Sequence, residues 1–139
     1  MQRKYCAVCA IVTAAALICL AALGKQRKEP VHHGEIHLTD AQMRETWLNL
    51  YGWEVTPLSQ SSTRMPCEYQ TEIGQAWLVM QGKQGLSPLD FGGKDAVRYV
   101  YRVENMREDT FCAELLLCDD ILAGAMVYDA QSGKIQPVR

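Results

Sequence analysis

The stretch from Gln84 to Asn105 restricts the possible folds of this chain more than any other part of it. It combines a helix-stop signal with a glycine pair, Gly92-Gly93, and then a run in which two kinds of side chain alternate. One side of the run carries Val97, Tyr99, Tyr101 and Val103, and the other carries Arg98, Val100, Arg102 and Glu104. This period of two predicts a strand that is buried on one face, with its tyrosines toward the core.

A first helix is expected before this strand. Thr39 and Gln42 have the spacing of a capping box, and an apolar stripe follows at helical intervals: Met43, Trp47, Leu50 and Tyr51. Gly52 ends the helix. The residues after it predict a short strand at 53–55 and a polar loop at 59–63, and we assign Trp47 and Trp53 to core packing.

A second helix is expected from Pro66, which suits a first helical turn because its missing amide hydrogen costs little there. Apolar residues again follow at helical spacing, at Tyr69, Ile73, Ala76 and Met80. Gly85 is the expected C-cap. Residues 90–93 then predict a turn and not a phosphate loop, because a phosphate loop requires a helix directly after its glycines.

Two further strands, 111–118 and 121–128, are joined by Asp119-Asp120, and two residues between apolar runs predict a tight hairpin. Its register places Phe111, Ala113, Leu115 and Leu117 on one face with Leu122, Gly124, Met126 and Tyr128. A short final strand is expected within 134–138. The predicted fold class is therefore α+β, with two helices packed on one face of a three- to four-stranded antiparallel sheet.

An apolar segment at residues 5–24 is long enough, at about 1.5 Å per residue, to cross the roughly 30 Å core of a bilayer. Its length and the cations directly after it favour an uncleaved transmembrane anchor, and signal cleavage after Gly24 is the alternative. Cations on its two sides nearly balance, so the orientation stays open at this point. The expected organisation is a short basic tail (1–4), the anchor (5–24), a juxtamembrane linker (25–38) and one small domain (39–139).

All three histidines lie in the expected linker, at His32, His33 and His37, together with Glu35. In an extended backbone His33, Glu35 and His37 point to the same side, which permits a metal site. A metal site also needs a fixed backbone and supporting hydrogen bonds, and the linker supplies neither. We therefore predict a solvated tether and assign no metal ligand.

The cysteines fall into two groups. Three lie within the apolar segment, where a thiol behaves as a small apolar group: Cys6, Cys9 and Cys19. Cys67, Cys112 and Cys118 lie in the expected domain. Cys112 and Cys118 are about 20 Å apart along one predicted strand, which is too far for a disulfide. Either of them can pair with Cys67, or all three are buried thiols, and we favour the buried thiols.

The charge of the chain is unevenly distributed. Its net charge of −2 combines +4 from residues 1–29 with −6 from residues 30–139. An acidic domain with scattered cations argues against nucleic acid as a partner, because phosphate binding needs a basic face. The expected partners are the membrane, through residues 5–24, and an unidentified protein.

No residues in the expected domain have the pattern of a catalytic, cofactor or metal site. Histidine is confined to the linker, so serine and cysteine lack their usual base. The carboxylate pairs Glu108-Asp109 and Asp119-Asp120 lie in predicted turns, where solvation leaves pKa values ordinary and acid catalysis weak. We assign no catalytic residue, no cofactor and no metal ion.

Five short motifs occur in a fixed order along the chain. They are Tyr51-Gly52-Trp53-Glu54-Val55, Met65-Pro66, Met80-Gln81-Gly82-Lys83-Gln84-Gly85, Gly93-Lys94 and Arg98-Tyr99-Val100-Tyr101. In order and spacing they resemble a bacterial family, the domain of unknown function 4830, over residues 38–138. Ala123-Gly124-Ala125 stands where that family tends to have Gly-Gly-Asp, so we carry no functional residue over. The resemblance implies an N-terminal membrane segment and a domain outside the cytoplasm.

The sequence favours a membrane-anchored, extracytoplasmic binding or protein-interaction domain in a single-pass protein of a Gram-positive bacterium. The alternatives are secretion after signal cleavage, and a secreted or anchored enzyme of unrecognised mechanism. A concave pocket with a strongly perturbed titratable group would favour the enzyme. An unpaired sheet edge or an exposed apolar patch would favour a protein partner. Whether Arg98 and Arg102 meet solvent, a helix or a partner stays open.

Overall fold

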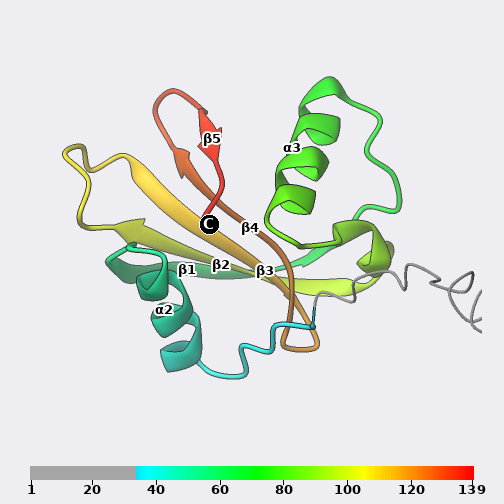
Figure 1. Ribbon diagram of the computed structural model, residues 1–139, viewed down its shortest axis with the longest axis horizontal. Coiled ribbons are helices and arrows are strands. Elements are labelled where there is room, and N and C mark those ends of the chain that lie inside the picture. Colours follow the sequence, from blue (N-terminus) through cyan, green and yellow to red (C-terminus); the bar gives the residue numbers. More distant parts are fainter. Residues whose placement is uncertain (1–33) are drawn as a thin grey trace, which may run out of the picture. The chain divides into compact units, whose positions relative to one another are not determined.

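The computed structural model describes residues 34–139 of the chain (Figure 1). The predicted membrane segment (5–24), its three cysteines, and His32 and His33 lie outside the described residues. Within the described part, neither α-helix has both the length and the apolar character needed to cross a bilayer.

Residues 34–139 form an α+β fold whose antiparallel strands lie side by side in chain order, β1-β2-β3-β4-β5. The elements are α2 (Ala41–Leu50), β1 (Val55–Arg64), α3 (Glu72–Lys83), the 3-10 helix η1 (Pro88–Phe91), β2 (Asp95–Val103), β3 (Phe111–Cys118), β4 (Ile121–Asp129) and β5 (Ile135–Gln136). The predicted class is confirmed. The sheet has five strands, where three to four were expected.

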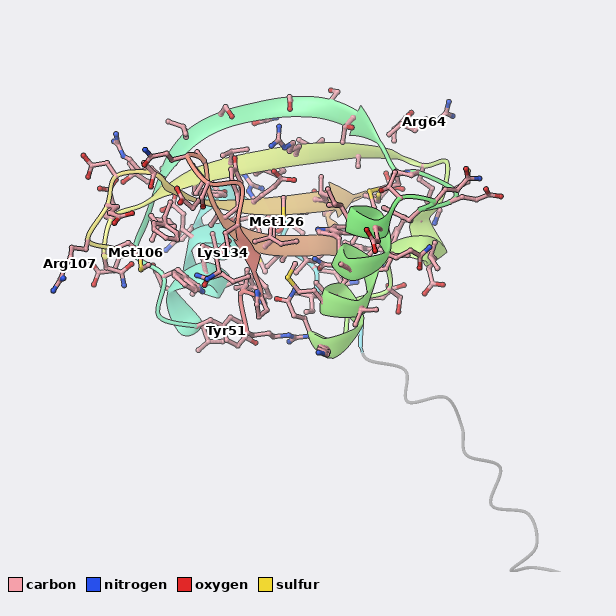
Figure 2. All side chains as sticks on the ribbon, turned by 90° about the horizontal axis from the view of Figure 1, so that it is seen from above. Tyr51, Arg64, Met106, Arg107, Met126 and Lys134 are labelled. Carbon is pink, nitrogen blue, oxygen red and sulfur yellow. The ribbon has the colours of Figure 1, made fainter. Side chains whose placement is uncertain are left out.

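β1 is much longer than the short strand predicted at 53–55. Residues 59–63, expected to be a polar loop, pair with β2 from Ser59 opposite Val100 to Thr63 opposite Ala96. Nine of the ten β1 residues are exposed, and a strand that buries neither face needs no alternation of apolar residues. β1 forms the outer margin of the sheet at the top of Figure 2, where Arg64 projects from its end.

α2 turns a different face toward the sheet from the one predicted. Its N-cap is Asp40, one residue after the expected Thr39, and the Asp40 carboxylate accepts a hydrogen bond from the Met43 amide at 2.8 Å. The predicted stripe was wrong at Met43 and Leu50, which are exposed. The buried side chains of the helix are Arg44, Trp47 and Leu48.

α3 starts later than expected, and its predicted apolar stripe is only partly buried. Its N-cap is Thr71, so Pro66 precedes the helix and does not open it. Gly85 follows the helix with a φ of 72°, in agreement with its predicted role at the C-terminal end. Ile73, predicted to be buried, is exposed, and the single buried side chain of the helix is Gln81.

Two glutamines complete the edge of β4 beyond the point where the two-residue β5 ends. The Gln81 amide group donates to the Ala125 carbonyl at 2.9 Å and accepts from the Ala125 amide at 2.9 Å. Gln84 donates to the same carbonyl at 3.0 Å and accepts from the Val138 amide at 2.7 Å. Side chains of α3 and of its C-cap Gln84 thus satisfy backbone groups that a longer fifth strand would otherwise pair.

α2 and α3 lie on opposite sides of the sheet, whereas both were expected on one face (Figure 1; Figure 2). On the α3 side, Trp77 lies against Gly124 of β4, where an added Cβ would be 2.9 Å from the indole. Glycine is therefore the residue that lets this helix approach the sheet. The main core lies on the α2 side and includes Trp47, Leu48, Tyr101, Leu115 and Val127.

A β-bulge in β4 reverses the faces predicted for that strand. Leu117 pairs with Leu122 as predicted, but the next pair is Leu116 with Gly124, so Ala123 is an additional residue. One extra residue moves every following side chain to the opposite face. Three predicted core neighbours of Leu117 therefore face away from α2: Gly124, Met126 and Tyr128.

The folded unit begins before Thr39. The buried Leu38 donates its amide hydrogen to the Asp120 carbonyl at 2.8 Å, and the Leu122 amide donates to the Ile36 carbonyl at 2.8 Å. Residues 36–38, which were expected to belong to the linker, therefore pack against the hairpin of β3 and β4.

Candidate functional site

Two charged residues in the described part of the chain are buried: Arg44 in α2 and Glu114 in β3. Burial of a charge is costly unless an opposite charge or several hydrogen bonds compensate for it. Within the described residues, Glu114 has such an opposite charge and Arg44 does not, so the surroundings of Arg44 form the candidate site.

Glu114 is compensated by a neighbouring strand. Arg98 of β2 donates to Oε2 of Glu114 through Nε at 2.7 Å and through Nη2 at 2.6 Å. This hydrogen bond raises the pKa of Arg98, although burial acts in the opposite direction. Arg98 therefore meets a carboxylate of the sheet, whereas Arg102 is exposed and lies 3.0 Å from Glu104.

Arg44 has no such partner within residues 34–139. The residue is 9% exposed, and no carboxylate of the described residues lies within ion-pair distance. Its Nε donates to the Tyr101 hydroxyl at 3.1 Å, and its guanidinium carbon lies 3.8 Å from the centre of the Tyr99 ring. A cation–π contact and one hydrogen bond to a neutral group offset only part of the desolvation of the charge.

Tyr101 does not supply the missing negative charge. Burial raises the pKa of Tyr101 above its ordinary value, and it outweighs the opposite effect of the hydrogen bond from Arg44. The phenol is therefore neutral at physiological pH. The Nη1 and Nη2 atoms of Arg44 donate to no acceptor within 34–139 and retain contact with solvent. The Nη edge of a guanidinium matches the two oxygens of a carboxylate.

Arg44 lines a cavity of about 270 Å³ between α2 and β1. The register of β1 against β2 shifts between Pro57 and Ser59, so a bulge occurs in the wall of the cavity. The surrounding residues come from three elements: Ala41 and Arg44 of α2, Pro57, Leu58, Ser59 and Gln60 of β1, and Tyr99, Val100 and Tyr101 of β2. A buried cation, two tyrosines and a polar strand thus share one small space.

The free edge of β1 lies beside this cavity. The Met65 amide donates to the Lys94 carbonyl at 2.9 Å, and hydrogen-bonded and non-bonded pairs alternate along an antiparallel ladder. Since the register is regular from 59 to 64, the alternation directs the backbone groups of Gln60, Ser62 and Arg64 away from β2. These donors and acceptors have no neighbouring strand in the described part of the chain.

The residues considered from the sequence do not form a site. His37 lies 3.4 Å from Glu35 at an exposed position, and no group of three or more potential metal ligands occurs among residues 34–139. Asp119 and Asp120 have φ values of 47° and 65° and form the predicted hairpin turn. Glu108-Asp109 is exposed in the loop after β2.

The three described cysteines are free thiols. The prediction that Cys112 and Cys118 do not pair is therefore confirmed. The expectation of three buried thiols was wrong for Cys67, which is exposed. Burial raises the pKa of Cys118, which is the opposite of what activates a thiol as a nucleophile.

Sequence reasoning missed Arg44, although the chain carries a signal for it. Arg44 lies three, four and seven residues before Trp47, Leu48 and Tyr51, which is the spacing of one helical face. A cation in such a stripe indicates a buried charge. The prediction chose Met43 for this face, because it is the apolar residue at the neighbouring position.

Comparisons with protein-family models, with curated proteins and with solved structures find no match to the chain. No functional residue is therefore carried over from a relative.

Proposed function

We propose that residues 34–139 form a protein-interaction domain that binds an extended segment of a partner protein along β1. The observation that carries this proposal is the ten-residue edge strand with its outward backbone groups unpaired. Extended peptides add to such edges through main-chain hydrogen bonds, and nearby pockets select their side chains. The cavity at Arg44 is a pocket in that position.

The side chains of β1 are compatible with such an addition. Natural proteins block long edges with charges, prolines and bulges. β1 has its proline and its bulge together at Pro57, and residues 59–63 beyond them carry only small hydroxyl groups and one amide. The regular half of the edge therefore stays open to a partner strand.

We also propose that residues 5–24 anchor this domain to the cell membrane and that the domain acts outside the cytoplasm. The length of the apolar segment supports the anchor. The resemblance to the domain of unknown function 4830 supports the orientation. A surface-held domain with an open strand edge suits the recognition of another membrane or extracellular protein.

The test uses the purified full chain and a displayed library of random ten-residue peptides. Ser62→Pro removes an outward-facing amide donor without removing a bond to β2, and Ser62→Ala is the matched control. We expect the original chain and Ser62→Ala to select the same peptides, and Ser62→Pro to bind them at least about tenfold more weakly. Circular dichroism on all three chains checks that the fold is retained.

Equal binding by the Ser62→Pro chain would contradict the proposal. A second copy of the chain is the competing occupant of the edge. A dimer in sedimentation that Ser62→Pro dissociates would assign β1 to self-association instead.

A further inference from the structure

We propose that Arg44 and its cavity bind the carboxylate of an acidic side chain on the extended segment that pairs with β1. This inference rests on the proposed function, because the paired segment is what carries the carboxylate to the cavity. The ligand is therefore an acidic peptide segment in extended conformation.

The charge around Arg44 favours an anion. Arg44 is the buried cation without a carboxylate in the described part of the chain, and its Nη1 and Nη2 atoms are not used by any acceptor there. Two nearby carboxylates do not fill this role. Asp40 accepts the Met43 amide as the cap of α2, and Glu45 raises the pKa of Tyr101 through space without forming an ion pair with Arg44.

A carboxylate fits this position better than a larger anion. The guanidinium carbon lies 3.8 Å from the centre of the Tyr99 ring, and its Nε donates to the Tyr101 hydroxyl, so two contacts restrict the orientation of its Nη1 and Nη2 atoms. Two parallel N–H groups in fixed orientation bind a carboxylate with two hydrogen bonds. The 270 Å³ cavity has room for one side chain and is smaller than most sites for complete organic ligands.

The position of the cavity along β1 indicates a side chain and not a chain terminus. The cavity contacts β1 at residues 57–60, and the strand continues on both sides, from Val55 and as far as Arg64. A segment that pairs with the open residues 59–64 and continues past the bulge therefore passes the cavity within its length. The Tyr99 ring lies on β2, one strand further in than the edge, so we expect glutamate to be preferred over the shorter aspartate.

The experiment measures this preference with peptides selected by the full chain. Each acidic residue of a selected, C-terminally amidated peptide is replaced in turn by its amide, and dissociation constants are measured with the original chain and with Arg44→Met. We expect one position at which Glu→Gln weakens binding to the original chain by about tenfold or more. The same replacement leaves the affinity for Arg44→Met unchanged, because this variant lacks the cation that binds the glutamate carboxylate.

Arg64→Gln provides the matched control, since Arg64 is an exposed cation on β1. We expect this chain to distinguish glutamate from glutamine as well as the original chain does. Discrimination that is lost with Arg64 and retained without Arg44 overturns the inference. Selection of peptides that need a free C-terminus and no acidic residue also overturns it, because the carboxylate is then a chain terminus.

The two proposals fail in different ways. Binding that depends on Ser62 but shows no Arg44-dependent discrimination overturns the carboxylate site alone. Binding that is insensitive to Ser62→Pro, or a library that yields no binding peptide, contradicts the proposed function and the carboxylate site together.

Discussion

At the scale of single residues, Arg44 makes the free energy of unfolding smaller than an apolar residue at this position would. Its charge is largely removed from water; its Nε donates one hydrogen bond and its guanidinium contacts one ring, but no carboxylate of residues 34–139 pairs with it. Natural proteins keep such residues where function needs them, and stability is often gained by replacing them. The stability of variants at this position therefore distinguishes a binding residue from a structural one.

We predict that Arg44→Met combined with Tyr101→Phe stabilises the unbound protein by about 1 kcal/mol. The double change removes the buried cation and also its partner, so no hydroxyl is left without an acceptor or donor. Urea unfolding of the full chain measures the difference in the free energy of unfolding. Arg44→Met alone is the control and should gain less, because the Tyr101 hydroxyl loses its hydrogen bond. A double variant that is less stable than the original chain would show that the guanidinium is a structural group.

Asp129 predicts a pH dependence of stability. Its carboxylate accepts from the Ser132 hydroxyl at 2.6 Å and from the Gln131 amide at 3.0 Å, and these bonds lower its pKa to about 2 from 3.8. A group with a lower pKa in the folded state stabilises the fold above its unfolded pKa and loses this contribution as pH falls through the folded pKa. We therefore expect Asp129 to contribute above about pH 4 and to lose that contribution toward pH 2.

Urea unfolding midpoints between pH 2 and pH 6 test this dependence in the original chain and in Asp129→Asn. The two chains should differ above pH 4 and should converge toward pH 2. A difference that stays constant over this range would mean that the carboxylate charge does not stabilise the turn.

At the scale of elements, local sequence patterns were sufficient to predict some strands and turns but not others. The β2 strand and the hairpin at Asp119-Asp120 were predicted, because alternation and a two-residue turn are local properties. The extra residue Ala123 was not, since a bulge is a property of two strands together. Residues 59–63 of β1 were mistaken for a loop because their burial does not alternate, and the candidate site lies beside this strand.

The attachment of α3 to β4 shows a second limit of sequence patterns. An apolar stripe was expected to hold the helix. Trp77 does lie against Gly124, but Gln81 also holds the helix, through two hydrogen bonds to Ala125. The sequence does not indicate which backbone groups a glutamine in a helix will form hydrogen bonds with. The need for it arises from the shortness of β5, which leaves the edge of β4 incomplete.

We predict that Gln81→Leu destabilises the fold by about 1–3 kcal/mol, although leucine is the more apolar residue. The change leaves the amide hydrogen of Ala125 without its acceptor, whereas the Ala125 carbonyl keeps its bond from Gln84. Lys83→Leu is the control, because Lys83 is exposed on the same helix, and we expect less than about 0.5 kcal/mol there. Chemical unfolding of the full chain measures both, and equal effects would argue against the strand-like role of Gln81.

At the scale of the whole molecule, the proposed recognition of an acidic segment has to act against the overall charge. Residues 30–139 carry −6, so an acidic partner is repelled at long range and attracted only where Arg44 is reached. Specificity then comes from the geometry of the edge and cavity and not from electrostatic steering. A membrane anchor on both partners would offset this weak attraction at a distance, because confinement to one surface raises their effective concentration.

The last prediction concerns that anchor. The apolar run at 5–24 is longer than a usual signal core and is followed directly by Lys25, Arg27 and Lys28, so we expect export to leave residues 1–24 in place. Intact-mass measurement of the protein recovered from membranes of the cells that express it should give the full chain. Ala22→Leu removes a small residue that a signal peptidase would read, and it should change nothing if no cleavage occurs. A mass that corresponds to residues 25–139 in the original chain, with the full-length mass only in Ala22→Leu, would indicate signal cleavage and secretion. The domain would then have no membrane anchor.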